Sequence, residues 1–246
     1  MNLQKLKEKL LEKTLIARKQ IGMNFKREIK NTTIATCIAV LAAGASFVTY
    51  EPSLLGAATS QFTVSTTITP EISFSTAATN VSLGSVPGQT GGTLNGGTQV
   101  VVATNDSLGY TMTIVSSSSP ALVGNTQGGT IPDYVPTVNA TPDFSFVVAA
   151  NKAGFGYTVE ASTSSDLAPA FLDNSTTCGV GSTDTVDKCW YRASTTAKTI
   201  VNRTTVPPSS GATTTIKFRL TINSNPTPSI TNDTYVATST LTATAN

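Results

Sequence analysis

The sequence predicts an all-β protein: an antiparallel β-sandwich of about ten strands, Ig-like or jelly-roll-like, preceded by an N-terminal signal or anchor helix. Three observations lead to this prediction. Apolar and polar residues alternate over several short stretches after residue 58. Of the 188 residues from 59 to 246, 39 are Thr and 23 are Ser, and Thr is favoured in strands. No stretch in that part of the sequence has an apolar stripe with helical spacing.

The first 58 residues differ in charge from the rest and are expected to form a leader. They hold nine basic and four acidic residues, whereas residues 59–246 hold seven basic and ten acidic ones. A basic cluster at Lys26–Lys30 precedes the uncharged apolar stretch Ile34–Val48, which is typical of an export signal. Cleavage is expected after Gly56-Ala57-Ala58, with Ala43-Gly44-Ala45 as the other candidate. The protein is therefore expected outside a bacterial cell or on its surface.

Two alternatives remain open for this leader. Residues 32–50 are nearly long enough to span a bilayer, which takes about 20 apolar residues, so residues 23–58 are either a signal peptide or a membrane anchor. Met23 looks like an ordinary signal-peptide start. Residues 1–22 are then either an over-extended gene start or a cytoplasmic helix before an anchor.

Residues 59–246 are expected to form one sandwich domain, because each alternating stretch would bury one face and expose the other. The expected strands carry the following apolar positions: Phe62, Val64 and Ile68; Tyr110, Met112 and Ile114; Phe144, Phe146 and Val148; Phe155, Tyr157 and Val159; Ile216, Phe218, Leu220 and Ile222; and a closing strand from Tyr235 to Ala243. Clusters such as Asn95-Gly96-Gly97 and Asn105-Asp106 are expected to be turns. Residues 115–142 and 162–189 are expected to be long loops, the second an insertion.

Cys178 and Cys189 are the cysteines of the expected exported part. A pair of cysteines in an oxidising compartment predicts a disulfide, and this one would fix the 162–189 insertion next to Trp190 and Tyr191.

The chemistry available argues against an enzyme. The chain has no His, which excludes Ser–His–Asp, Cys–His and His-based zinc sites. Five acidic residues between Glu160 and Asp187 include material for a carboxylate pair, but nothing in the sequence fixes two of them at a catalytic distance. No catalytic residue and no cofactor is predicted. A weak calcium site is predicted at Asp173, Asp184 and Asp187, whose oxygens are hard ligands.

Aromatic residues give the one candidate for ligand binding. Trp190, Tyr191 and Tyr134 are possible stacking platforms for a glycan, the alternative being that they pack in the core. Nucleic acid is not expected as a partner, because the acidic body lacks a basic patch. The expected partners are a cell-wall or surface glycan, or further copies of the chain. Contact with a membrane is expected only through an uncleaved leader.

Three short pieces resemble WxL-type bacterial cell-surface proteins. Thr104–Ile114 is similar to the family's Asp-containing turn and following strand, with Tyr110 where the first motif Trp would stand. Thr234–Thr244 looks like the closing strand, and the stretch from Ile72 to Val86 is also similar. The resemblance implies an exported, Ser/Thr-rich β-sandwich that associates with the bacterial envelope.

Together these features predict a non-enzymatic cell-surface protein with a structural or adhesive role, for which cell-wall glycan is the candidate ligand. Two alternatives are a fibre or pilus-like subunit that assembles by strand exchange through Gln61–Thr69 and a carbohydrate-binding module.

Overall fold

The computed structural model describes residues 59–246, so the expectations for the signal or anchor helix and for Met23 lie outside the described residues. Residues 65–246 form one compact unit, called the body below. Residues 59–64, the described part of a second unit, have no regular secondary structure. Within 59–246, no helix is long and apolar enough to cross a membrane.

The body is all-β and its strand ladders are antiparallel, as the sequence predicts. The main sheet has the order β1-β2-β9-β6-β7, and its strands are β1 (Ile72–Thr76), β2 (Gly92–Thr104), β9 (Ala212–Ile222), β6 (Ala153–Ala161) and β7 (Tyr191–Arg192). The second sheet has the order β11-β3-β8, with β11 (Ser239–Ala245), β3 (Tyr110–Ser116) and β8 (Lys198–Arg203). A small third sheet holds β10 (Tyr235–Val236), β4 (Leu122–Gly124) and β5 (Thr130–Ile131). Two 3₁₀ turns, η1 (Ser164–Asp166) and η2 (Pro169–Phe171), follow β6.

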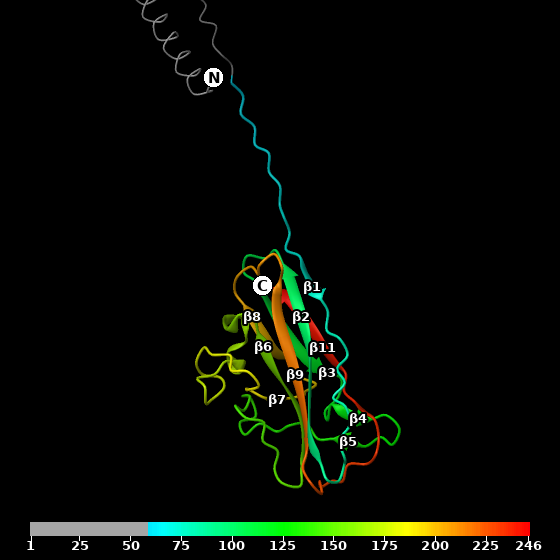
Figure 1. Ribbon diagram of the computed structural model, residues 1–246. Coiled ribbons are helices and arrows are strands. Elements are labelled where there is room, and N and C mark those ends of the chain that lie inside the picture. The colour runs from blue at the N-terminus through cyan, green and yellow to red at the C-terminus, as the bar shows by residue number, and fades with distance from the viewer. Residues whose placement is uncertain (1–58) are drawn as a thin grey trace, which may run out of the picture. The chain divides into compact units, whose positions relative to one another are not determined.

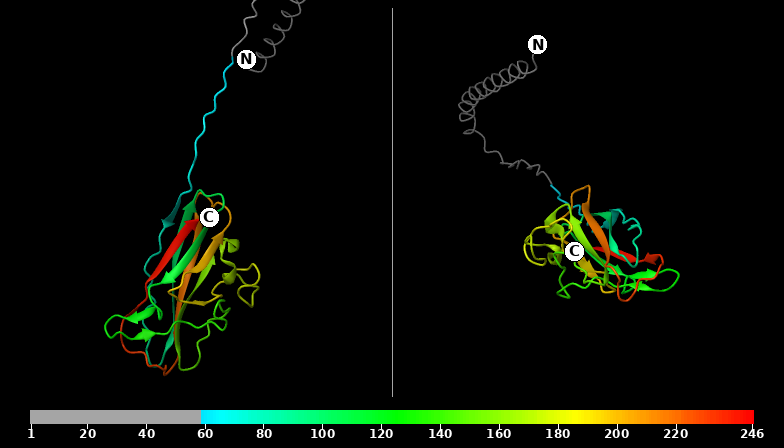
Figure 2. Two further views of the ribbon diagram at one scale, coloured as in Figure 1. Left: turned by 180° about the vertical axis from the view of Figure 1, so that it is seen from behind. Right: turned by 60° about the horizontal axis from the view of Figure 1, so that its bottom comes forward.

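The main sheet and the second sheet bury their facing sides in one core (Figures 1 and 2). Val100 and Ile216 come from the main sheet, and Met112 and Val201 come from the second. Each is at most 1% exposed, and burying one such side chain contributes roughly 1.5–3 kcal/mol. A second cluster under the small sheet includes Leu122 and Ile131. The fold is therefore held by apolar layers between sheets.

Three of the expected strands are confirmed. In β3, Tyr110, Met112 and Ile114 are buried, while the residues between them are half-buried. The alternation over 216–222 likewise forms part of β9. The stretch 155–159 lies in β6, but β6 is buried on both faces. The reason is Gly156, where a Cβ atom would lie 2.6 Å from the carbonyl oxygen of Tyr191 and 3.0 Å from the Cβ of Tyr134, so neighbouring chain packs directly on this strand.

Five expected elements differ from the structure, and one of them is the expected loop 115–142, which contains β4 and β5. Residues 61–69 form no strand, and Phe62, Val64 and Ile68 are exposed. Phe144–Val148 keep the predicted alternation of burial, but they pack as an irregular segment without a ladder. Asn95-Gly96-Gly97 lies inside β2 and is not a turn. The expected closing strand is divided into β10 and β11, which belong to different sheets.

The turn between β2 and β3 carries the chain from one sheet to the other. The carboxylate of Asp106 accepts the N–H of Leu108 at 2.8 Å, which closes the turn. Gly109 has a φ of 80°, and a Cβ there would lie 2.3 Å from the carbonyl oxygen of Arg203. Only glycine fits this position, and it allows β3 to begin directly beside β8.

Candidate functional site

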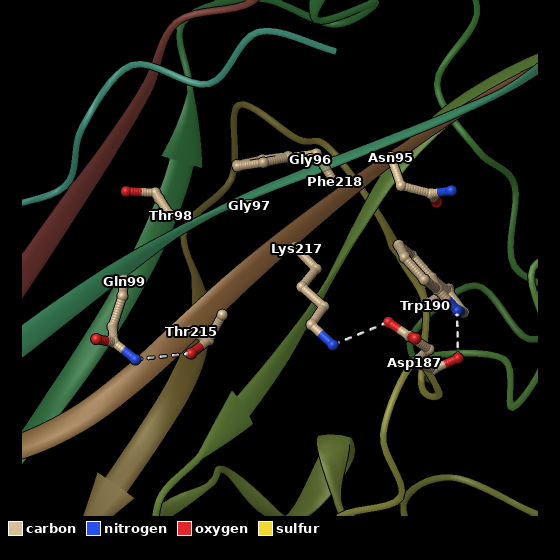
Figure 3. Close-up of a pocket in the computed structure, with 10 residues that line it drawn as sticks. All are labelled: Asn95, Gly96, Gly97, Thr98, Gln99, Asp187, Trp190, Thr215, Lys217 and Phe218. Carbon is tan, nitrogen blue, oxygen red and sulfur yellow. Dashed lines mark hydrogen bonds and ion pairs between the residues drawn. The ribbon is translucent and has the colours of Figure 1, made fainter.

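A hollow of about 410 Å³ lies on the outer face of the main sheet, over β2 and β9 (Figure 3). The strand register pairs Asn95 with Arg219, Gly97 with Lys217 and Gln99 with Thr215. Side chains alternate between the two faces of a sheet, and the intervening residues of these strands, such as Ile216, point into the core. Gly97 contributes no side chain to this face, so the hollow opens over its backbone.

The segment Asp187–Trp190 forms one wall of this hollow and is fixed in three ways. Cys189 is disulfide-bonded to Cys178, as the sequence predicts, with the two Cα atoms 5.6 Å apart. The indole Nε1 of Trp190 donates to the carbonyl oxygen of Asp187 at 2.9 Å. The guanidinium carbon of Arg219 lies 4.2 Å from the centre of the Trp190 ring, a cation–π contact. The wall therefore has a defined position relative to β9.

The charged groups beside the hollow are paired with one another. The Lys217 ammonium donates to Glu160 Oε1 at 2.7 Å and to Asp187 Oδ1 at 3.0 Å. The same Glu160 oxygen accepts the backbone N–H of Asp187 at 2.9 Å. Burial alone would lower the pKa of Lys217, but these two carboxylates outweigh it and raise the pKa above its usual value. Lys217 is thus a protonated anchor with two of its three N–H donors engaged, not a free base.

Arg219 is held in a similar way. Its Nε donates to Asn95 Oδ1 at 2.6 Å, and its guanidinium covers Trp190. Gln99 Nε2 lies 3.5 Å from Thr215 Oγ1 at the other end of the hollow. What the hollow offers a ligand is consequently a mostly apolar surface on a rigid sheet, with a few amide, hydroxyl and backbone groups and one ammonium at its edge.

The three aromatic residues expected to stack on a glycan are all buried. Trp190 is 1% exposed, Tyr134 is 2% exposed and Tyr191 is 6% exposed. Phe146 joins two of them, since its ring centre is 4.4 Å from that of Tyr134 and 5.2 Å from that of Trp190. Tyr191 packs in the core instead, with the Lys198 ammonium 4.5 Å from its ring centre. Trp190 borders the hollow, but its ring is covered by Arg219, so none of the three rings has a face open to a sugar.

The three acidic residues considered for calcium have separate protein partners. Both carboxylate oxygens of Asp173 accept hydrogen bonds, from Ser175 and Thr185. Asp184 accepts the N–H of Ala161 at 2.9 Å, and Asp187 pairs with Lys217. Within residues 59–246, no group of three His, Cys, Asp or Glu residues is placed to hold a metal ion.

Asp173 and Asp184 have pKa shifts in opposite directions. Burial alone would raise the pKa of Asp173, but the hydrogen bonds from Thr185 and Ser175 outweigh it, and the pKa is lowered. Burial raises the pKa of Asp184, and its single backbone hydrogen bond does not compensate. The Asp173 carboxylate makes hydrogen bonds within the 162–189 insertion. The Asp184 carboxylate bonds the insertion to Ala161 at the end of β6.

The hollow was not predicted from the sequence, although a signal for it was present. Asn95, Gly97 and Gln99 alternate with Gly96 and Thr98 in a strand-like pattern. The two adjacent glycines indicated a turn and masked that pattern. In the folded chain Gly96 faces inward, where a Cβ would lie 2.6 Å from Val81 Cγ1, so the strand uses glycine for close packing there.

No protein-family model matches this chain, and the comparisons with curated proteins and with solved structures also give no match.

Proposed function

We propose that this protein is a non-enzymatic structural and adhesive protein of the bacterial cell surface, and that the hollow over Gly97 binds a neutral region of a cell-wall or surface glycan. The observation that carries the proposal is the state of the polar groups at the hollow. The charged side chains that border it have protein partners, and the bare backbone at Gly97 lies at its floor. Asn95 and Gln99 line it as well, and each keeps part of its amide group outside the bonds to Arg219 and Thr215. A mostly apolar surface with a few amide and backbone groups suits a sugar, whose ring has apolar faces and a hydroxyl edge, whereas free charge would suit an ionic ligand.

The cell-surface part of the proposal is supported by the disulfide and by the surface of the body. A disulfide is compatible with an extracellular location, because such bonds persist in oxidising compartments. The export-like pattern of Lys26–Val48 points the same way. A Thr- and Ser-rich β-domain with a disulfide cross-link suits a protein displayed on the cell surface rather than an enzyme.

We propose that the protein is not an enzyme because the carboxylates beside the hollow are paired with a lysine. Glu160 and Asp187 both engage Lys217, and this pairing holds the lysine protonated. A glycosidase needs one protonated acid and one free carboxylate on opposite sides of the bond that is cut. The geometry at the hollow fits binding better than hydrolysis.

The proposal is tested by binding the purified protein to isolated cell walls and to soluble wall fragments. In Gly97→Thr the new side chain fills the floor of the hollow, and we expect at least a tenfold loss of affinity. Thr93→Val is the matched control, because Thr93 lies on the same face of β2 and beyond the hollow, where its hydroxyl pairs with Thr221. Thermal melting of both variants verifies that the fold is retained. Equal binding by wild type and Gly97→Thr overturns the assignment of the site, and release of sugar products overturns the non-enzymatic role.

A further inference from the structure

Residues Gln61–Thr69, called the donor segment below, have the sequence of a strand but no partner strand in the structure. Phe62, Val64 and Ile68 fall on one side of an extended chain, and the nine residues include no charge, Gly or Pro. These three side chains are 87%, 85% and 80% exposed, respectively. An uncharged segment that is rich in β-branched residues and has an exposed apolar side has the sequence features of a strand that pairs with another chain.

The end of the donor segment is hydrogen-bonded to the turn between β2 and β3. Asn105 Oδ1 accepts the N–H of Glu71 at 2.7 Å, and Asn105 Nδ2 donates to the carbonyl oxygen of Thr69 at 3.2 Å. The hydroxyl of Thr104 donates to the carbonyl oxygen of Glu71 at 2.6 Å. These bonds hold Thr69–Glu71 at the β2–β3 turn, immediately before β1.

One long strand edge of the body has a ladder partner on one side only. β11 is an edge strand of seven residues. The opposite edge of the same sheet, β8, is covered, since Ala168 donates to the carbonyl oxygen of Ile200 at 3.0 Å and Leu167 bridges to Val201. β7 at the edge of the main sheet has only two residues. β1, at the other edge of that sheet, has five residues and an irregular register between Phe74 and Thr76.

The register identifies which backbone groups of β11 are free. Ser117 donates to the carbonyl oxygen of Thr238 at 2.9 Å, and Asn246 donates to that of Gly109 at 3.3 Å, on either end of the β11–β3 ladder. Antiparallel bonding alternates along a strand, so Thr240, Thr242 and Thr244 bond to β3. The backbone N–H and C=O groups of Leu241, Ala243 and Ala245 therefore point away from β3, and the described residues include no backbone partner for them.

The surroundings of this edge also suit an apolar strand. β11 runs beside β1 without pairing to it (Figure 1), and the apolar side chains at this seam, Ile72, Phe74, Leu241 and Ala243, are only partly buried. β11 carries no charge, Pro or Gly, which are the usual features that block an edge strand from pairing. A strand added here would place its apolar side chains over that seam.

We propose that the donor segment of one copy adds as a strand to β11 of a second copy. Each copy then has one donor and one acceptor, so the contact is head to tail and repeats into chains rather than closing into a symmetric dimer. The partner is a second copy because both strands lack charge, have similar lengths and are present once in every molecule. The proposal involves residues distant in sequence from Asn95–Gln99, so it does not depend on glycan binding at the hollow.

The first test uses the full-length chain, expressed with its own leader in an export-competent bacterial host. Molar mass is measured by light scattering after size-exclusion chromatography over a concentration series. The donor variant Phe62→Asp, Val64→Asp and Ile68→Asp is expected to lose all oligomers. The control variant Thr63→Asp, Ser65→Asp and Thr67→Asp adds the same charge to the opposite side of the segment and is expected to keep them. A monomeric wild type at its highest soluble concentration, or equal loss in both variants, overturns the proposal.

The second test assigns the acceptor edge. Ala243→Pro removes an N–H that points away from β3, so it blocks the free edge without cutting the β11–β3 ladder. This variant keeps its donor segment, and the donor variant keeps its β11. Each alone is expected to be monomeric, and their mixture is expected to form a one-to-one dimer that grows no further. Thermal melting verifies that both variants are folded. Failure of the mixture to form this dimer, with both proteins folded, overturns the assignment of β11.

Discussion

Removing the Cys178–Cys189 disulfide is expected to destabilise the body by an amount that the structure fixes. The two cysteines are 11 residues apart, and the chain-entropy relation gives about 3 kcal/mol at 25 °C for a loop of this size. For a domain of this size, 1 kcal/mol corresponds to a change of about 2–4 °C in Tm, so a loss of roughly 6–12 °C is expected. The variant is Cys178→Ala with Cys189→Ala.

The measurement has an internal fluorescence probe and a control that separates the cross-link from side-chain packing. Trp190 is the single tryptophan of the chain and follows Cys189 directly, so its fluorescence reports unfolding of the cross-linked region. Both sulfurs are buried, and alanine also removes their packing, about 0.8 kcal/mol for each methylene-sized group. Wild type with the disulfide reduced lacks only the bond and serves as the control. Urea unfolding of reduced and oxidised wild type with equal free energies would refute the role given to the cross-link.

Three further predictions concern single buried groups. Asp166→Asn leaves the guanidinium of Arg203 buried without its counter-charge and is expected to cost about 3–5 kcal/mol in urea unfolding, and a cost under about 1 kcal/mol would contradict this. Tyr110 has a buried hydroxyl without a hydrogen-bond partner and a pKa raised to about 12 by burial, so Tyr110→Phe is expected to leave the free energy of unfolding unchanged or to raise it by up to about 1 kcal/mol, whereas a clear loss would reveal a partner. The lowered pKa of Asp173 means that its contribution is complete above about pH 4 and is lost as pH falls through the folded-state pKa, so Asp173→Asn should flatten the stability profile below about pH 4, and an unchanged slope there would count against it.

Alternation of apolar and polar residues predicts a strand correctly where the core covers mainly one face of that strand. β3 and β9 satisfy this condition, and the alternation of Met112 with Thr111 and Thr113 locates β3 correctly. The pattern locates β6 but does not reveal that both of its faces are buried, because the residues that cover its second face come from distant parts of the chain. The pattern fails at Phe144–Val148, where Phe146 packs on Tyr134 and Trp190 but the segment forms no ladder.

The candidate site could be predicted only in part. The disulfide follows from the cysteine count and is confirmed. The pairing of Lys217 with Glu160 and Asp187 depends on the β6–β9 register and on the path of the insertion, neither of which local sequence determines. Gly97 illustrates the same limit. A glycine in a strand and a glycine in a turn look alike until the opposing chain at Gly96, formed by Val81 and Leu83, is in place.

The most direct test of the head-to-tail account is residue-resolved hydrogen exchange along β11. In assembled wild-type protein, the amides of Leu241, Ala243 and Ala245 are expected to be protected, and in the Phe62→Asp, Val64→Asp and Ile68→Asp variant they are expected to exchange rapidly. Thr240, Thr242 and Thr244 bond to β3 and are the internal control, protected in both proteins. Protection that alternates along β11 in the variant and becomes continuous in the assembled wild type is the predicted result. The same alternating pattern in both proteins would contradict the account.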